Sequence, residues 1–273
     1  MIIIGAGLAG LHCARLLGRR GLRVLLVDRK DSLNNSIHTT GIFVRRTLED
    51  FDIPDDCLGP AVRHVTLYSP SRRRMELVSP HDEFRVGKMG QLYTRYLDHC
   101  LLAGVAWLPG TRYGGHREAK GHLMVRLDNK RGRHSSRWVA ARYLVGADGA
   151  NSRVAGNLHL ERNREWIVGV EDVLTDVPLD GPPRLHCFLD PVIAPGCGCA
   201  AWSPLFANRR YWSLHAQRCA CRFSIHLRGT CFSAADLFRM WTLNGPRKLS
   251  VRQVGLYREE VFNQATLLLT KLS

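Results

Sequence analysis

Residues 1–28 read MIIIGAGLAGLHCARLLGRRGLRVLLVD, and this stretch decides the fold. The apolar run Ile2–Ile4 fits a buried parallel strand, and it stops at a glycine. Apolar residues then recur at helical spacing from Leu11 to Leu17, and Gly21 is suited to end that helix. A second apolar run ends at Asp28. The pattern predicts a strand, a tight turn, a helix and a second strand.

Three glycines in the predicted turn have different tasks if the turn binds a dinucleotide. Gly5 allows the sharp turn, Gly7 lets the backbone approach a pyrophosphate, and Gly10 lets the helix pack against the strand. The N-terminus of the helix supplies N–H groups and a positive dipole for phosphates. Asp28 would accept hydrogen bonds from the ribose hydroxyls, whereas an NADP site would prefer a small residue with a nearby arginine. Arg29 and Lys30 follow Asp28, and the acid alone leaves NAD and FAD both open. The plain alternative is a glycine-rich turn in an ordinary α/β unit.

A second motif lies in residues 142–154, which read RYLVGADGANSRV. It resembles a segment of the FAD-dependent family that includes aromatic hydroxylases and geranylgeranyl reductases. That family pairs an N-terminal GxGxxG with a later segment similar to ADGxxSxxR. The resemblance implies that FAD is the cofactor and that Asp148 and Gly149 lie near its pyrophosphate and ribityl chain. Arg153 directly follows Ser152, as it does in the geranylgeranyl reductase branch.

The same resemblance implies a cation ahead of the helix predicted to start near Leu92, where it would touch the ribityl or phosphate groups. Lys88 and Arg85 are the two candidates, and a lysine would bind as a point charge. Solvated surface cations are the alternative. The loop at residues 38–42 corresponds to one that approaches the isoalloxazine ring in similar flavoproteins. Arg45 and Arg46 follow this loop. One of them is a candidate ligand of the flavin phosphate, and the alternative is that both are exposed cations on a helix.

Further strands are predicted along the rest of the chain. Residues 123–127 and 138–145 form a predicted hairpin around a basic turn. Other candidate strands are residues 62–68, 75–78, 166–173, 184–189 and 211–216. We therefore predict an α/β fold, with a Rossmann-type FAD-binding domain and an inserted, mostly antiparallel substrate sheet. The predicted division is residues 1–30 and 85–155 for the FAD-binding domain, residues 31–84 and 156–250 for the substrate domain, and residues 251–273 as an atypical tail.

Charge and cysteine are both unevenly distributed. The net charge is +15, and residues 196–273 hold eleven Lys/Arg against three Asp/Glu. Six of nine cysteines fall between Cys187 and Cys231, and without a recognisable secretory signal reduced thiols are the expectation. A metal site or a redox pair is one interpretation of two C-x-C pairs, Cys197/Cys199 and Cys219/Cys221. Their spacing is tighter than that of common zinc sites, so we predict no metal. No nucleic-acid module accompanies the basic turns, so no nucleic-acid partner is expected.

Similar flavoproteins carry a third motif, a strand ending in Gly-Asp, near the C-terminus. This sequence has no Gly-Asp pair after Asp148. We interpret the chain as a truncated or frame-shifted product, with a divergent branch as the alternative. On that interpretation the sheet edge beside the flavin site is expected to be open.

The function predicted from the resemblance is an FAD-dependent oxidoreductase. It would reduce or hydroxylate a small or isoprenoid-like organic substrate, with NAD(P)H as a candidate electron donor. The alternatives are an FAD-binding remnant without activity and an NAD-only dehydrogenase. A cytoplasmic location is expected, a lipid substrate would bring the protein to a membrane surface, and neither a catalytic residue nor an oligomeric state is assigned.

Overall fold

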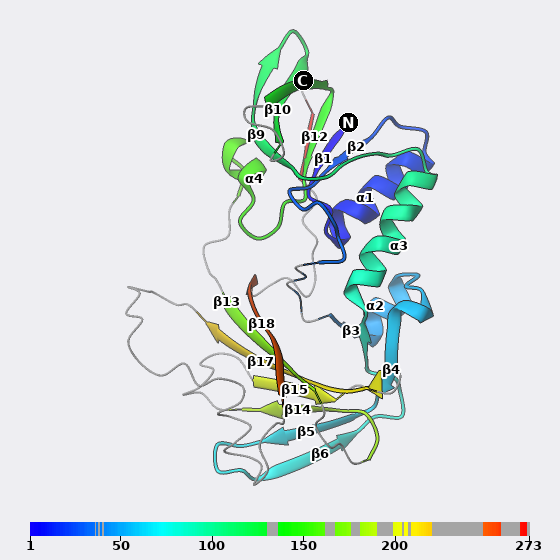
Figure 1. Ribbon diagram of the computed structural model, residues 1–273, viewed down its shortest axis with the longest axis vertical. Coiled ribbons are helices and arrows are strands. Elements are labelled where there is room, and N and C mark those ends of the chain that lie inside the picture. Colours follow the sequence, from blue (N-terminus) through cyan, green and yellow to red (C-terminus); the bar gives the residue numbers. More distant parts are fainter. Residues whose placement is uncertain are drawn as a thin grey trace. The chain divides into compact units, whose positions relative to one another are not determined.

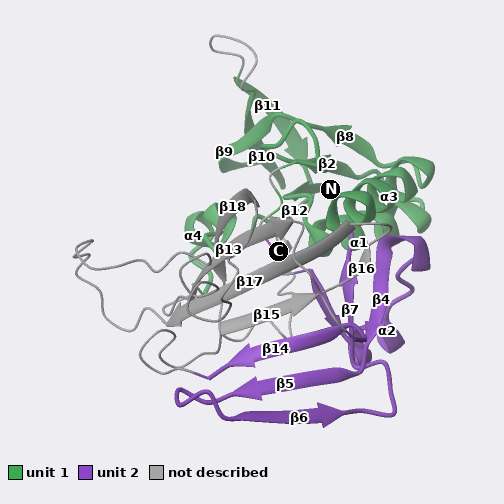
Figure 2. Ribbon diagram, turned by 60° about the horizontal axis from the view of Figure 1, so that its bottom comes forward, with its two compact units in different colours: residues 1–37, 89–164, 260–273 green, residues 38–88, 165–259 purple. Residues whose placement is uncertain are grey.

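A computed structural model gives the arrangement of the chain (Figure 1). It describes residues 1–35, 37, 39, 41–129, 136–161 and 181–189, and the backbone of the strands at residues 167–175, 199–203, 205–206, 209–219, 248–257 and 268–271. The chain divides into two compact units (Figure 2). Unit 1 comprises residues 1–37, 89–164 and 260–273, and unit 2 comprises residues 38–88 and 165–259.

Unit 1 is built on a five-stranded sheet of order β19-β12-β1-β2-β8. Its elements are β1 (Ile2–Ile4), α1 (Leu8–Arg19), β2 (Leu25–Val27), α3 (Met89–Leu102), β8 (Ala106–Leu108), β9 (Thr111–Ala119), β10 (His122–Asn129), β11 (Ser136–Ala141), β12 (Tyr143–Gly146), α4 (Arg153–Asn157) and β19 (Leu268–Lys271). Strands β12, β1, β2 and β8 are parallel. The strand–turn–helix–strand start is therefore confirmed.

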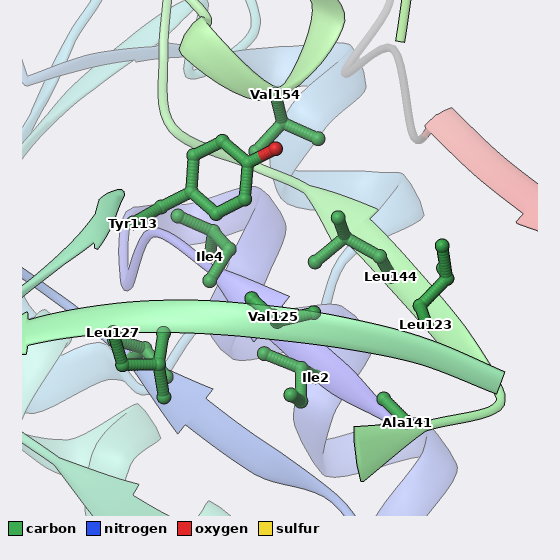
Figure 3. Close-up of a cluster of buried hydrophobic side chains, with 10 residues drawn as sticks. Ile2, Ile4, Tyr113, Leu123, Val125, Leu127, Ala141, Leu144 and Val154 are labelled. Carbon is green, nitrogen blue, oxygen red and sulfur yellow. The ribbon is translucent and has the colours of Figure 1, made fainter. Parts of the chain in front are cut away.

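Both faces of the short central strand β1 are buried, as expected for a parallel sheet. Ile2 and Ile4 face a cluster that the three-stranded antiparallel sheet β11-β10-β9 completes with Val125 and Leu127 (Figure 3). Ile3 points to the opposite face because side chains alternate along a strand. Helices α1 and α3 lie side by side in this unit (Figure 1).

Two expectations for unit 1 were wrong. Residues 138–145 do not form one strand, because β11 ends at Ala141 and β12 begins at Tyr143 in a different sheet. The chain thus leaves the hairpin and enters the parallel sheet at Arg142. The edge of β12 is also not open, since β19 pairs with it antiparallel, with Gly146 opposite Leu268. Pairing with β19 engages backbone groups that β12 would otherwise expose as an edge strand.

Unit 2 contains a large, mostly antiparallel sheet of order β18-β13-β17-β15-β14-β5-β6, in which only β14 and β5 pair in parallel among the described strands. A second sheet has the order β3-β7-β4. The elements are β3 (Ile42–Val44), α2 (Arg45–Asp50), the 3₁₀ turn η1 (Asp55–Cys57), β4 (Leu58–Val62), β5 (His64–Tyr68), β6 (Arg74–Val78), β7 (Phe84–Gly87), β13 (Ile167–Thr175), β14 (Arg184–Phe188), β15 (Cys199–Ser203), β16 (Leu205–Phe206), β17 (Arg209–Cys219) and β18 (Lys248–Tyr257). Residues 62–68 are divided at Arg63, because β4 pairs with β7 whereas β5 pairs with β6.

Candidate functional site

The two sequence motifs meet at the carboxyl ends of β1, β2 and β12. The Gly5 amide donates to the Val27 carbonyl at 2.8 Å, and the Ala147 amide donates to the Ile4 carbonyl at 2.7 Å. Ligands of open α/β sheets bind outside the carboxyl ends of the strands. The candidate site is therefore this edge of the unit 1 sheet, with the turn of residues 5–10 on one strand and the turn of residues 146–149 on its neighbour.

The glycines of the first turn have different surroundings. Gly5 has φ +103°, and a Cβ atom there would collide with the Ala147 carbonyl. A Cβ atom on Gly10 would collide with the Gly5 carbonyl. At Gly7 an added Cβ meets no atom within 4 Å. Gly5 and Gly10 thus allow the two motifs and the helix to pack closely, whereas the Gly7 backbone remains accessible.

Helix α1 begins directly after this accessible residue. No side chain caps it at Gly7, and its first turn holds no acidic residue. The first N–H groups of any helix lack intrahelical acceptors, and the helix dipole places positive potential there. The N-terminus of α1 therefore has the properties of an anion site of the kind that binds a pyrophosphate.

Asp28 follows β2 and is held in a fixed position. Its Oδ2 atom accepts a hydrogen bond from the Ala6 amide at 2.7 Å, and its Oδ1 atom accepts one from the Lys30 amide at 2.8 Å. An ionised carboxylate has about four lone-pair sites, so two or more remain for further donors such as hydroxyl groups. Burial lowers the pKa of the Lys30 ammonium, and the neighbouring Asp28 carboxylate opposes that effect.

Asp148 has a structural task that the sequence analysis missed. Its Oδ1 atom accepts from the Ser152 hydroxyl at 2.5 Å, and its Oδ2 atom accepts from the amides of Arg153 and Val154 at 2.7 and 3.2 Å. Ser152 caps α4 by accepting from the Ala155 amide at 3.0 Å. A serine four residues after an acid, at the start of a helix, is the signal that would have predicted this arrangement. Gly149 completes the turn with φ +87°.

Lys88 and Arg85 belong to unit 2, and both contact the segment around η1. The Lys88 ammonium donates to the Asp56 carbonyl at 3.0 Å. The Arg85 guanidinium donates to the Gly59 carbonyl at 2.9 Å and to the Asp55 carboxylate at 2.6 Å. These contacts order the end of β7. A role of Lys88 in flavin binding stays a prediction.

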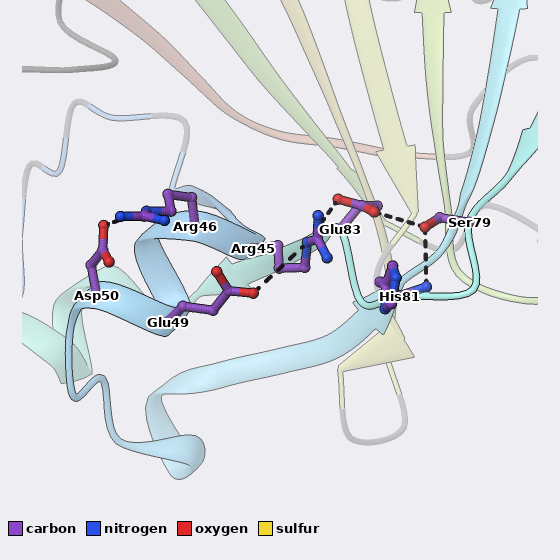
Figure 4. A network of polar contacts seen from close by, with 7 residues as sticks. All are labelled: Arg45, Arg46, Glu49, Asp50, Ser79, His81 and Glu83. Atoms are coloured by element: carbon purple, nitrogen blue, oxygen red, sulfur yellow. Dashed lines mark hydrogen bonds and ion pairs between the residues drawn. The ribbon is translucent and has the colours of Figure 1, made fainter.

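Arg45 and Arg46 open the short helix α2 and form ion pairs within unit 2 (Figure 4). Arg46 pairs with Asp50 at 2.8 Å, and Arg45 lies 3.5 Å from Glu83. This is the arrangement of exposed helical cations. In the loop at residues 38–42, His38 and Thr40 lie outside the described residues, and the Gly41 carbonyl accepts from the Gly87 amide at 2.7 Å.

The side chains of the two C-x-C pairs lie outside the described residues. Among the described residues there is no group of three or more His, Cys, Asp or Glu side chains placed to hold a metal ion. Of the described cysteines, Cys13, Cys57 and Cys100 are buried, and burial raises the pKa of the Cys100 thiol to about 11. Such a thiol is protonated at neutral pH and is a poor nucleophile.

Comparisons with known proteins agree with this geometry. Residues 1–222 match the model of the FAD binding domain family, and the chain belongs to that family. It is 28% identical over 166 residues to the chloroplastic geranylgeranyl diphosphate reductase of Oryza sativa subsp. japonica, covering 57% of this chain and 35% of the relative. It is 30% identical over 207 residues to a 3-(3-hydroxy-phenyl)propionate/3-hydroxycinnamic acid hydroxylase of Escherichia coli K12, covering 70% of this chain and 36% of the relative.

These curated relatives are longer, and the chain spans little more than a third of their length. Among solved structures, a geranylgeranyl bacteriochlorophyll reductase-like protein from Thermoplasma acidophilum matches with a TM-score of 0.76 at 15% identity, over 94% of this chain and 65% of that one. A flavin-dependent monooxygenase solved with FAD and substrate matches with a TM-score of 0.65 at 18% identity, over 94% of this chain and 49% of that one. The predicted fold class and the resemblance to FAD-dependent reductases and hydroxylases are thereby confirmed.

In the part of the chain that the structure describes, no helix combines the length and the apolar character needed to span a bilayer.

Proposed function

We propose that this chain binds FAD at the carboxyl edge of the unit 1 sheet and acts as a flavin-dependent oxidoreductase. The observation that carries the proposal is the direct packing of the two motifs, in which Gly5 leaves no space for a side chain beside Ala147. Membership of the FAD binding domain family supports the choice of FAD over NAD alone.

The residues at this edge fit the parts of FAD. The uncapped N-terminus of α1, with Gly7 open beside it, would take the pyrophosphate. Asp28 would accept hydrogen bonds from the ribose hydroxyls while it keeps its contacts to Ala6 and Lys30. The turn at Gly149 would lie near the ribityl chain. The Asp148 carboxylate already accepts three hydrogen bonds, so its contribution would be to hold this turn in shape.

FAD, when bound, supplies hydride and electron transfer that no amino-acid side chain provides. The chain's own residues would bind and orient the cofactor, and no residue is assigned as acid, base or nucleophile. For the substrate we propose an isoprenoid-like molecule that is reduced at a double bond, with NAD(P)H as the electron donor. The support is the adjacent Ser152-Arg153 pair and the similarity to a geranylgeranyl diphosphate reductase. Hydroxylation of an aromatic acid is the competing reaction.

A second candidate function is FAD binding without turnover. It is the alternative that the sequence analysis left open. Such a chain would retain the cofactor site of unit 1 but would not pass electrons to a substrate.

The visible spectrum of the purified chain, with and without added FAD, tests the proposal. We expect the absorption bands of oxidised flavin to remain after gel filtration and to bleach when NADPH is added without oxygen. Bands that no donor bleaches would favour binding without turnover. A protein that takes up no FAD would refute both functions. NADPH consumption with geranylgeranyl diphosphate, compared with 3-(3-hydroxyphenyl)propionate and oxygen, then separates reduction from hydroxylation.

A further inference from the structure

The ends of helices α1 and α3 form an unusual surface in unit 1. Leu102, Leu101 and Leu22 are 87%, 47% and 45% exposed. Arg19, Arg20 and Arg23 are exposed beside them on the α1 side. These six residues are called the leucine–arginine end below.

The six residues are held together by the packing of the two helices. An added Cβ atom on Gly18, in the last turn of α1, would lie 2.8 Å from the Ala103 carbonyl oxygen and 2.9 Å from a Val105 methyl group. The last turn of α1 therefore touches the segment that follows α3. Both figures of the whole chain show the two helices side by side (Figures 1 and 2).

The backbone at both helix ends is ordered by hydrogen bonds of the same type. The amides of Gly21 and Leu22 donate to the carbonyls of Gly18 and Leu17 at 2.8 and 3.2 Å. The amides of Gly104 and Val105 donate to the carbonyls of Leu101 and Cys100 at 2.9 and 3.0 Å. This is the pattern of glycine-terminated helices. The backbone that carries the exposed leucines is therefore ordered by hydrogen bonds.

The charge of this surface has one sign. Residues 8–27 contain four arginines and no Asp or Glu, and α3 contains one acid, Asp98. Exposed leucines beside several arginines are complementary to an anionic lipid bilayer. Such a bilayer has anionic headgroups at its surface and an apolar interior beneath them. A second copy of the chain would instead bring six arginines together without acids. A nucleic acid would contact the arginines but gives no reason for the exposed leucines.

The position of this surface leaves the cofactor site accessible. Helix α1 begins at Leu8, next to the glycine turn, and ends at Arg19. A helix of this length spans about 18 Å at ~1.5 Å per residue. The leucine–arginine end therefore lies at the opposite end of α1 from the candidate FAD site, and docking through it would not cover that site.

We propose that the leucine–arginine end docks this protein onto the surface of anionic lipid membranes. The leucines enter the headgroup region, and the arginines contact lipid phosphates. Docking of this kind is peripheral, reversible and sensitive to salt.

Flotation of the full chain with lipid vesicles tests the proposal. We expect binding to phosphatidylcholine vesicles that contain phosphatidylglycerol, and at least tenfold weaker binding to phosphatidylcholine alone. Replacing Arg19→Gln together with Arg20→Gln should weaken binding about tenfold or more, since each arginine near an anionic surface contributes about fivefold. Leu101→Ser with Leu102→Ser should weaken it similarly and demands little of the fold, because these side chains are exposed.

The matched control is Arg72→Gln with Arg73→Gln, in the turn before β6 of unit 2, which removes the same charge elsewhere. This control should bind within twofold of wild type. An equal loss in the control would overturn the proposal in favour of non-specific attraction. Wild-type protein that does not float, or that floats equally with uncharged vesicles, would overturn it too. Light scattering that shows a dimer abolished by the Leu101/Leu102 change, without flotation, would assign the surface to a second copy.

Discussion

Gly7 and Gly10 lie three positions apart in one turn, and a methyl group added to each meets different surroundings. At Gly10 it would collide with the Gly5 carbonyl, whereas at Gly7 it projects into open space. Gly7 has φ −74° and ψ −178°, which alanine adopts without strain. One position is thus required by the fold and the other is available to a ligand.

We expect Gly7→Ala to keep the thermal stability of the protein and to weaken FAD binding at least tenfold, because its methyl group enters the space of the pyrophosphate. Gly10→Ala should destabilise the fold by about 1–3 kcal/mol or more through overpacking. Thermal unfolding without cofactor and FAD titration by fluorescence quenching give the two quantities. Wild-type FAD affinity in Gly7→Ala would exclude a pyrophosphate at this turn.

Asp28→Ala should reduce FAD affinity by about tenfold or more. The reason is that a hydrogen bond to a charged group contributes ~1.5–3 kcal/mol, and the variant loses those to the ribose. The same change removes acceptors for the Ala6 and Lys30 amides, so unfolding of the cofactor-free variant must be measured beside it. If FAD retention is unchanged, Asp28 does not bind the ribose.

At the scale of elements, α4 depends on two side chains. Ser152→Ala should cost about 1 kcal/mol as a lost helix cap. Asp148→Ala should cost more, because it removes an acceptor for the Ser152 hydroxyl and two amides. Chemical unfolding gives these free energies, and FAD titration shows whether affinity follows stability. A large loss of FAD in Asp148→Ala at unchanged stability would instead indicate direct contact with the cofactor.

A histidine in the strand pair β14–β5 should make the stability of the fold depend on pH. Burial, and secondly the Arg184 charge, lower the pKa of His186 from 6.5 to about 4, and its Nδ1 atom lies 2.9 Å from the Tyr68 hydroxyl oxygen. The unfolded chain therefore binds a proton that the folded chain does not. Stability should fall as the pH decreases from about 6.5 toward 4, by an amount on the order of 3 kcal/mol, and should not change above pH 6.5 on account of this residue.

Unfolding midpoints measured across this pH range test the effect. His186→Phe cannot titrate and keeps an aromatic ring against Tyr68, so its stability should depend less on pH. Equal slopes for wild type and variant would assign the acid sensitivity to other groups.

Local sequence patterns predicted the elements that are marked by a continuous apolar run or by a glycine motif. The run Ile2–Ile4, the glycine turn and the ADG turn were located from residues alone. Strand β9 was missed, because its sequence TRYGGHREA has two glycines and no apolar alternation. It forms nonetheless by pairing with β10 along its length, with a bulge near Leu127. Pairing partners override local propensity in such strands.

At the scale of the whole molecule, FAD binding should appear as added stability. A ligand at about a hundred times its Kd stabilises the folded state by ~2.7 kcal/mol. For a chain of this size that raises the Tm by roughly 5–10 °C. Thermal scans with increasing FAD measure the shift, and NAD⁺ serves as the matched dinucleotide control. An equal shift with NAD⁺ would contradict the preference for FAD.

The arrangement of the sheets was less accessible to sequence analysis than their presence. The antiparallel character of the large sheet was predicted, but its order joins β14 to β5, about 120 positions earlier in the chain. The covering of β12 by β19 also joins distant segments. Such pairings are selected by long-range complementarity, for which a local pattern holds no signal. The site itself was predicted as separate motifs, and the shared packing of Gly5 and Ala147 came from the structure.

That packing also sets an order of events in synthesis. The first turn reaches its final shape only when Ala147 and the strand before it have arrived, 142 positions later in the chain. A ribosome that has released only the first hundred residues carries the glycine motif without the neighbour that shapes it. Contacts of such long sequence separation form late because their loop-closure cost comes first. Nascent chains shorter than about half of this protein should therefore capture no cofactor, and loading should begin only after the second motif has left the exit tunnel.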